Sequence, residues 1–270
     1  MGNPLSPDFG ATARDYARYR AGFPDSFFDR LASLEIGKPD QLVVDLGTGT
    51  GTLARGFARR GCQVVGIDLA KPMLEQAHLF DAAEGTRIEY RMARAEETGL
   101  PGGSVDVVSA GQCWHWFDRA RAATEVARIL RPDGVLVIAH FDWIPLAGNV
   151  VHVTEALIES YNPPWKLGGG VGMYPEWLRD LGEAGFRRLE TFSYDVAVPY
   201  THESWRGRVR ASAGVGASLS EEKVRAFDEA LAHLLATRYP GEILEVPHRV
   251  FAVVARGPAS RGIGPQGGGA

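Results

Sequence analysis

Short apolar runs and longer amphipathic stretches alternate along most of the chain. Residues 41–51 form an apolar run that ends in glycines, and residues 53–61 place apolar side chains at helical spacing. Residues 62–70 form a second apolar run, and Pro72 then suits the first turn of a second helix. Continuous apolar runs of this length are typical of strands buried on both faces of a sheet. The pattern therefore predicts strand, helix, strand, helix, the order of a parallel βαβ unit.

Further strands follow in the same rhythm, and we expect them at residues 88–92, 105–110 and 134–141. A helix over residues 120–130 separates the last two, and the Pro-Asp-Gly turn at 132–134 closes it. Five such units predict a mostly parallel sheet with helices on both faces.

The C-terminal part departs from this rhythm. Helices are expected at residues 150–161, 174–184, 202–212 and 220–239, a Pro/Gly-rich stretch at 162–172, and strands at 187–198 and 249–257. We expect the two late strands to complete a Rossmann-like, seven-stranded α/β sheet, and the intervening helices to form a lid. Residues 1–257 are then one domain, with a core of about 9–141 and lid segments of about 142–185 and 200–240. The Gly-rich tail 258–270 is expected to be disordered.

Composition and charge favour a small-molecule partner. The 270 residues are 45% hydrophobic and 23% charged, with a net charge of −4 and no run of either sign. No broad patch for nucleic acid or anionic lipid is therefore expected. The two cysteines, Cys62 and Cys113, have no zinc or redox spacing, and no apolar run approaches a membrane span. We expect a cytoplasmic protein, and the oligomeric state stays open.

A glycine-rich turn follows the first strand. It contains Asp45, Gly47, Gly49 and Gly51. Such a turn lets the backbone approach a nucleotide closely, at the carboxyl edge of the sheet. The third glycine comes one residue too early for the dinucleotide fingerprint, so a nicotinamide-dependent oxidoreductase is the less favoured alternative. Asp68, at the end of the second strand, can accept hydrogen bonds from both ribose hydroxyls.

Five segments in order carry a resemblance to a known family: VVDLGTGTG, VVGIDLA, ARAEETGLP, VDVVSAGQCWHWFD and ILRPDGVLVI. Together they resemble class I S-adenosylmethionine-dependent methyltransferases. The chain is most similar to the small-molecule branch with trans-aconitate-type and UbiE-like enzymes, which carries a Trp-His-Trp-Phe segment after strand four. The resemblance implies methyl transfer to an oxygen, nitrogen or carbon nucleophile of a small acid or secondary-metabolite intermediate, with S-adenosylhomocysteine as product. A non-catalytic or repurposed S-adenosylmethionine-binding protein on this fold is the alternative.

The resemblance also implies a set of cofactor-binding residues. They are Arg20, Asp45, Gly47, Thr48, Gly49, Gly51, Asp68, Leu69, Met73, Ala95, Glu96 and Gln112. The glycines pass the backbone under the methionyl part, Asp68 holds the ribose, and Leu69 and Met73 pack on the adenine. Arg94 stands where many relatives have an acid. Arg20 suits the methionyl carboxylate, although its helix can equally be a solvated amphipathic surface.

The segment 111–118 carries the candidate chemistry. Trp114, Trp116 and Phe117 can build a dry wall beside the sulfonium, which aromatic faces attract. His115 between them is the first candidate proton acceptor, and His140 at the end of strand five is the second. In the alternative, these aromatics pack under the lid and His115 caps the next helix.

Weaker candidates remain. Tyr16 and Trp165 are expected to contact substrate. Cys113 is expected to be a small buried thiol and not a nucleophile, and no short ligand spacing indicates a metal site. The three arginines in residues 206–210 suit either an anionic substrate or a solvated helix face.

Overall fold

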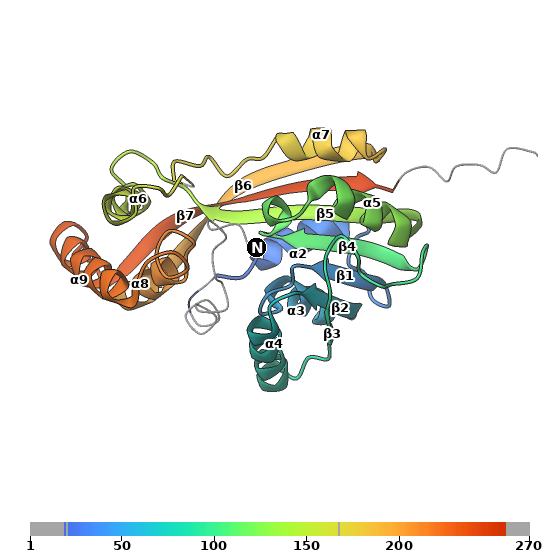
Figure 1. The fold of residues 1–270 in the computed structure, drawn as a ribbon, viewed down its shortest axis with the longest axis horizontal. Coiled ribbons are helices and arrows are strands. Elements are labelled where there is room, and N and C mark those ends of the chain that lie inside the picture. Colours follow the sequence, from blue (N-terminus) through green and yellow to red (C-terminus); the bar gives the residue numbers. More distant parts are fainter. Residues whose placement is uncertain (1–18, 20, 167, 258–270) are drawn as a thin grey trace, which may run out of the picture.

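Seven strands form one sheet in the order β3-β2-β1-β4-β5-β7-β6 (Figure 1). The computed structural model describes residues 19, 21–166 and 168–257. The strands are β1 (Leu42–Leu46), β2 (Gln63–Asp68), β3 (Glu89–Met92), β4 (Val105–Gly111), β5 (Leu130–Trp143), β6 (Arg187–Thr201) and β7 (Ile243–Arg256). The first five are parallel, and β7 is antiparallel to both β5 and β6. The predicted mostly parallel, Rossmann-like sheet is confirmed, and the two late strands complete it.

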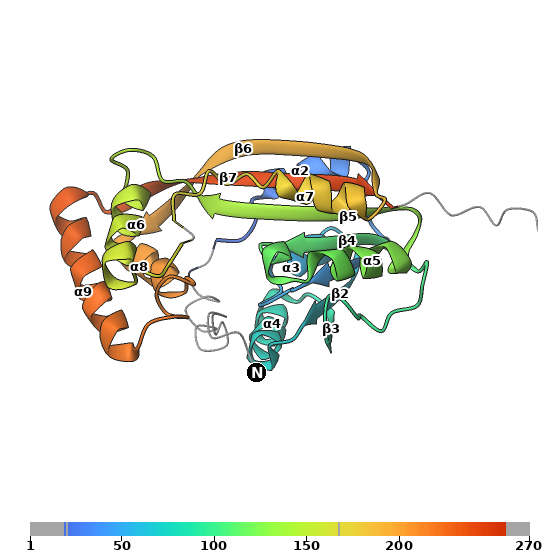
Figure 2. The same ribbon diagram turned by 45° about the horizontal axis from the view of Figure 1, so that its top comes forward.

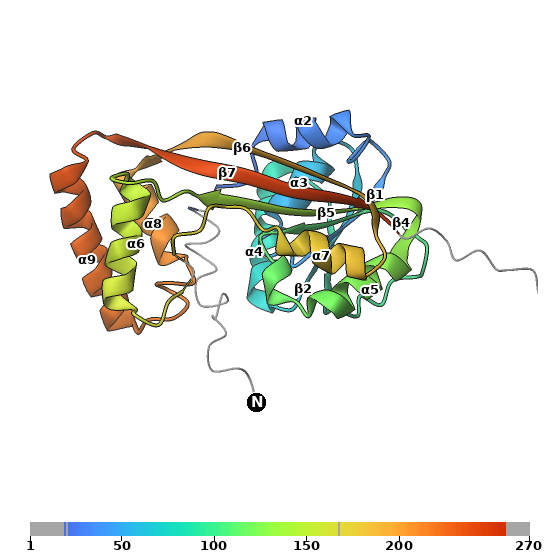
Figure 3. The same cartoon turned by 90° about the horizontal axis from the view of Figure 1, so that it is seen from above.

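Helices cover both faces of the sheet. They are α2 (Asp25–Ser33), α3 (Thr52–Ala58), α4 (Lys71–Glu84), α5 (Arg119–Ile129), α6 (Val150–Tyr161), α7 (Glu176–Glu183), α8 (His202–Arg210) and α9 (Glu221–Arg238). Figure 3 shows α2 and α3 on one side of the sheet and α5 and α7 on the other. Each pair buries its apolar face against a separate core cluster, one on each side of the strands. The sheet is therefore buried on both faces, as its continuous apolar strands require.

Strands β5, β6 and β7 are long and extend beyond the rest of the sheet, where further helices lie. β6 and β7 stay paired from Arg187 opposite Arg256 to Thr201 opposite Ile243. At that far end lie α6, α8 and α9, which we call the cap (Figures 1 and 2). The cap has a core of its own, which includes Trp205, Phe227 and Leu231. That these helices act as a lid stays a prediction.

The structure differs from the sequence-based expectation in three places. Helix α2 was not predicted, and the Pro-Asp-Gly turn at 132–134 is an irregularity inside β5, with Asp133 at φ 65° and a shifted register. β7 begins at Ile243 and not at residue 249. β7 pairs with β5 only from His248 onward, so at Pro247 the strand is paired with β6 alone. Proline is tolerated at such edge positions.

Candidate active site

A cavity of about 790 Å³ lies between the carboxyl ends of the parallel strands and the cap. Its sheet side is formed by residues that end or follow β1, β2, β4 and β5. Its other side is formed by Trp165, Lys166, residues within 168–176 and the helices α6 and α8. None of the helices that the structure describes has the length and apolar composition of a membrane span. Among the described residues, no group of three or more His, Cys, Asp or Glu side chains could hold a metal ion.

The turn between β1 and α3 brings backbone to the cavity wall. Gly47 and Gly49 line the cavity with φ angles of 59° and 57°, a left-handed conformation that favours glycine. A Cβ on Gly47 would lie 2.9 Å from Cβ and Sγ of Cys113, so the turn is packed tightly under the loop after β4. Gly51, at φ 78°, is the N-cap residue of α3, and neither it nor Thr48 lines the cavity.

The buried Asp45 side chain stabilises this turn through a hydrogen bond from Thr48. Its carboxylate is 1% exposed and accepts hydrogen bonds from Thr48 Oγ1 and Ser109 Oγ, both at 2.7 Å. Burial raises the pKa of Asp45 to about 6, although the two hydroxyl hydrogen bonds act in the opposite direction. Because Asp45 does not line the cavity, the structure places it behind the turn and not against a ligand.

Asp68 joins the glycine turn to the second strand. One carboxylate oxygen accepts a hydrogen bond from Gly49 N and the other from Ala70 N, both at 2.8 Å. Each carboxylate oxygen can accept a second bond, and the side chain lines the cavity, so two ligand hydroxyls can be bound here. The half-exposed Leu69 and the buried Met73 continue the same wall.

The far side of this wall is the segment after β3. Ala95 and Glu96 line the cavity, as does Arg94. Glu96 pairs with Arg94 Nε at 3.4 Å and accepts a hydrogen bond from Asp118 N at 2.9 Å. Arg94, for which the resemblance led us to expect an acid, thus pairs its guanidinium with Glu96.

Gln112, the first residue after β4, lines the cavity. Gln112 has φ 62°, and its backbone N–H donates to the Ala139 carbonyl at 2.8 Å. Its side-chain Oε1 is buried and has no hydrogen-bond partner among the described residues. The next residue, Cys113, donates its thiol to the Leu46 carbonyl at 3.1 Å, which fits the expected role as a small buried thiol.

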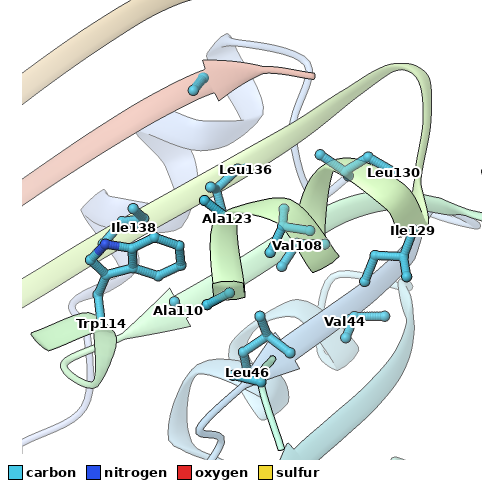
Figure 4. Close-up of a cluster of buried hydrophobic side chains, with 14 of the residues drawn as sticks. Val44, Leu46, Val108, Ala110, Trp114, Ala123, Ile129, Leu130, Leu136 and Ile138 are labelled. Atoms are coloured by element: carbon cyan, nitrogen blue, oxygen red, sulfur yellow. The ribbon is translucent and has the colours of Figure 1, made fainter. Parts of the chain in front are cut away.

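The aromatic segment divides between the core and the cavity. Trp114 is fully buried and packs beside Ile138, Ala110 and Ala123 (Figure 4), and it does not line the cavity. Trp116 is 43% exposed and does line it. The structure therefore places Trp116 where substrate contact was expected, and places Trp114 in the core instead.

His115 also lines the cavity and is exposed. The alternative in which it caps the following helix is not what the structure shows. Asp118 is the N-cap of α5, and its carboxylate accepts from Arg121 N at 3.2 Å.

Two histidines from neighbouring strand ends meet over the cavity. The ring centroids of His115 and His140 are 5.2 Å apart. His140 Nδ1 lies 2.7 Å from Asp142 Oδ2, the oxygen to which the Tyr174 hydroxyl also donates. Because a carboxylate only accepts, Nδ1 carries the proton in the neutral imidazole, and Nε2 then has the lone pair. His140 Nε2 is buried and has no hydrogen-bond partner among the described residues.

The cap side of the cavity contains Trp143, Glu155, Trp165, Arg208 and Ser212. Of the two residues expected to contact substrate outside segment 111–118, Trp165 lies here. A Cβ on Gly168 or Gly214 would come within 2.9 Å or 3.0 Å of its ring, so the indole is seated between two glycines. Tyr16 and Arg20 lie outside the described residues.

Residues 44–138 match the methyltransferase domain family. An uncharacterized methyltransferase of Mycobacterium tuberculosis is 35% identical over 153 residues, which are 54% of this chain and 60% of that protein. The chain thus spans about three fifths of the length of that curated relative.

Solved structures agree in fold. A putative type II methyltransferase from Anaeromyxobacter dehalogenans has a TM-score of 0.59 at 23% identity, over 89% of this chain and 98% of that one. The Haemonchus contortus phosphoethanolamine N-methyltransferase 2, solved with phosphomonomethylethanolamine and S-adenosylhomocysteine, has a TM-score of 0.56 at 20% identity, over 96% of this chain and 61% of that one. The protein therefore has the Rossmann-like fold that these methyltransferases share.

Proposed function

We propose that the protein transfers the methyl group of S-adenosylmethionine to an oxygen, nitrogen or carbon nucleophile of a small molecule, either an acid or a secondary-metabolite intermediate. The observation that carries the proposal is that Gly49 and Asp68 line the same cavity as the His115 and His140 pair. The matched methyltransferase domain, at residues 44–138, contains Gly49, Asp68 and His115, and His140 lies two residues beyond its end. The likeness of segment 111–118 to trans-aconitate-type enzymes supports the small-molecule class.

The residues present fit the cofactor. Asp68 offers carboxylate oxygens for the ribose hydroxyls, and the half-exposed Leu69 beside Met73 offers an apolar surface for the adenine. The backbone of Gly47 and Gly49 is open to the methionyl part because neither residue has a side chain. Gln112 Oε1, which is buried and has no hydrogen-bond partner among the described residues, would accept a hydrogen bond from the methionyl ammonium.

The chemistry divides between cofactor and protein. S-adenosylmethionine supplies an activated methyl: the nucleophile's lone pair bonds the methyl carbon while the carbon–sulfur bond breaks, leaving its electron pair on the sulfur of S-adenosylhomocysteine. His140 Nε2 takes the proton that the nucleophile loses, and Asp142 holds the imidazole in the tautomer that permits this. Trp116 and Phe117 line the cavity beside His115 and exclude water.

The need for a base depends on the acceptor. A hydroxyl, amine or enolisable carbon loses a proton on methylation, whereas a carboxylate does not. His115 and His140 are therefore both proposed as catalytic residues, with His140 as proton acceptor and His115 as the residue that orients the substrate.

The test is transfer from methyl-labelled S-adenosylmethionine to a pool of small metabolites, followed by mild base. Label that base releases is a methyl ester, and stable label is an ether, amine or carbon product. Binding of S-adenosylhomocysteine, measured by calorimetry, is expected in the wild type. Tight binding without transfer to any acceptor would refute the enzyme and leave a repurposed binding protein. No binding would refute the cofactor assignment itself.

A further inference from the structure

The part of the cavity lining that is not proposed to hold the cofactor is rich in aromatic rings. We call the lining residues from His115 to Gly214 the acceptor side. Its rings come from the loop after β4, from β5 and from the segment between α6 and α7, and they are Trp116, Phe117, Trp143, Trp165 and Tyr174. The cavity volume of about 790 Å³ lies in the upper part of the roughly 300–1,000 Å³ range of ligand pockets, so a small acceptor has room beside the cofactor.

Trp116 offers apolar surface to a ligand on this side. Among the described residues, the large apolar side chains that are exposed and also line the cavity are Leu69 and Trp116. Leu69 is proposed to pack on the adenine, whereas no part of the cofactor is proposed to contact Trp116. The Trp116 ring lies 4.5 Å from the His115 ring, which lies 5.2 Å from the His140 ring, measured between centroids. A ligand ring that packs on Trp116 would therefore lie next to the two histidines and would withdraw apolar surface from water.

The arginines of helix α8 are engaged by other protein groups. Arg206 Nε and Arg210 Nη1 both donate to Asp228 Oδ1 on α9, at 3.1 Å and 2.7 Å, and neither residue lines the cavity. Arg208 does line it and is 6% exposed. Its guanidinium carbon lies over the Trp143 ring, 4.4 Å from the ring centre. None of the three arginines is therefore assigned to an anionic substrate.

Two acids of the acceptor side hold its rings in place. Glu155 Oε1 accepts a hydrogen bond from Trp143 Nε1 at 2.8 Å, and Glu155 Oε2 accepts one from a backbone N–H at 2.8 Å. Asp142 Oδ2 accepts from the Tyr174 hydroxyl and lies 2.7 Å from His140 Nδ1. These carboxylates are thus bonded to protein donors, and they orient the rings that a ligand would contact.

The two other charged residues of the acceptor side have local explanations. Lys166 is exposed, and its Nζ donates to the Pro163 carbonyl at 3.3 Å. Glu176 lies in the first turn of α7, where the helix dipole favours an acid. The described lining of this side thus contains three acids and two bases. An anionic acceptor would find no surplus of positive charge there, and an ammonium would compete with protein donors for the carboxylates.

We propose that the methyl acceptor is a neutral phenol whose ring packs on Trp116. This inference rests on the proposed methyl transfer, and of the two acceptor classes named there it favours the secondary-metabolite intermediate over the acid. A charged acceptor of either sign would have to compete with the contacts of Arg208, Asp142 and Glu155.

The reaction that follows is the formation of an aryl methyl ether. A lone pair of the phenol oxygen forms the bond to the methyl carbon, and the carbon–sulfur bond breaks with its electron pair left on the sulfur. The phenol proton passes to His140, the proposed proton acceptor.

The test compares three phenols that share one ring and differ in charge. 4-Ethylphenol is neutral, 4-hydroxyphenylacetate is an anion and tyramine is a cation, whereas trans-4-ethylcyclohexanol is neutral with a saturated ring. Binding to protein saturated with S-adenosylhomocysteine is measured by calorimetry. The wild type is expected to bind 4-ethylphenol at least about tenfold more tightly than either charged phenol, because a buried charge without a new partner is costly. It is expected to bind 4-ethylphenol about threefold or more tightly than the cyclohexanol, the difference that an aromatic pair adds to area burial.

Substitutions of Trp116 assign the preference to its ring. Trp116→Leu keeps an apolar side chain without the ring and is expected to lose the preference for 4-ethylphenol over trans-4-ethylcyclohexanol, whereas Trp116→Phe is expected to keep it. Leu146→Ala alters an exposed apolar side chain that does not line the cavity, and this control keeps the wild-type preference. Binding of S-adenosylhomocysteine by each variant shows that it is folded.

The outcomes separate this inference from the proposed function. Binding of 4-hydroxyphenylacetate or tyramine that equals or exceeds that of 4-ethylphenol overturns the neutral phenol. So does equal binding of the cyclohexanol, an unchanged preference in Trp116→Leu, or no binding of any phenol at millimolar concentration. If 4-ethylphenol binds through Trp116 but no acceptor is methylated, the phenol site stands and the methyltransferase proposal fails. If methyl transfer is found only with acceptors that lack an aromatic ring, methyl transfer stands and the phenol is refuted.

Discussion

The role of Asp45 under the glycine turn can be tested quantitatively through the pH dependence of the free energy of unfolding. The side chain is buried and its pKa is raised to about 6, whereas an unfolded chain has an Asp pKa of about 3.9. Asp45→Asn removes the titration but keeps the shape of the side chain. The amide oxygen can still accept from one of the Thr48 and Ser109 hydroxyls, and the amide N–H₂ can donate to the oxygen of the other.

The magnitude follows from the pKa difference. Between about pH 4 and pH 6 the native wild type keeps a proton that the unfolded chain has lost, so the free energy of unfolding falls as pH rises through this window. A difference of about two units corresponds to ~3 kcal/mol, reached near pH 6 and constant above it. Asp45→Asn lacks this fall, so its stability relative to the wild type is expected to rise by that amount between pH 4 and pH 7.

The assay is urea unfolding of both proteins at half-unit pH steps from 4 to 7. Glu155, whose pKa burial also raises, and Glu125, whose pKa Arg128 lowers to about 2, contribute equally to both proteins and cancel in the difference. A stability difference that stays constant across the range would refute the buried, protonated Asp45. S-adenosylhomocysteine affinity is expected to stay within about threefold of the wild type, because Asp45 does not line the cavity.

Three further substitutions test the site. Asp68→Asn turns an amide toward a backbone N–H that now has no acceptor, and calorimetry should show S-adenosylhomocysteine affinity lowered roughly 10–100-fold. His140→Gln should lower kcat about 10²-fold or more, with cofactor affinity kept. Unchanged kcat would remove it from the mechanism. Gly47→Ala places a Cβ 2.9 Å from Cys113 at a φ of 59°, and thermal unfolding should show a loss of roughly 1–3 kcal/mol; wild-type stability would mean that the turn is not packed as described.

The cofactor half of the cavity was predictable because its determinants are local. Gly47 and Gly49 follow β1 directly, and Asp68 ends β2, so the strand order alone brings them to one edge of the sheet. The hydrogen bond from Gly49 N to Asp68 joins two residues that the βαβ connection must place side by side. Apolar runs and turn residues were sufficient to predict this arrangement.

The aromatic segment shows where local patterns stop being informative. Trp114 and Trp116 are two residues apart on a short 3₁₀ turn, and one fills the core while the other lines the cavity. Both residues are tryptophans, so the residue type does not distinguish them. The packing of Ile138 and Ala123 around Trp114 decides which one is buried (Figure 4). Sequence alone assigned both to the pocket.

The acceptor side of the cavity was beyond sequence reasoning for a related reason. Tyr174 reaches Asp142 across 32 residues, and Trp143 reaches Glu155 from a different element, so no short motif marks either contact. Helical spacing in α8 does separate Arg208 from its two neighbours, but only the position of Asp228 on α9 shows which face turns inward. The proposed cofactor site is therefore predictable from consecutive turns of the chain, whereas the opposite side of the cavity depends on tertiary contacts of the cap. Because the two proposed sets of residues come from different elements, the residues proposed to hold the cofactor do not determine the acceptor.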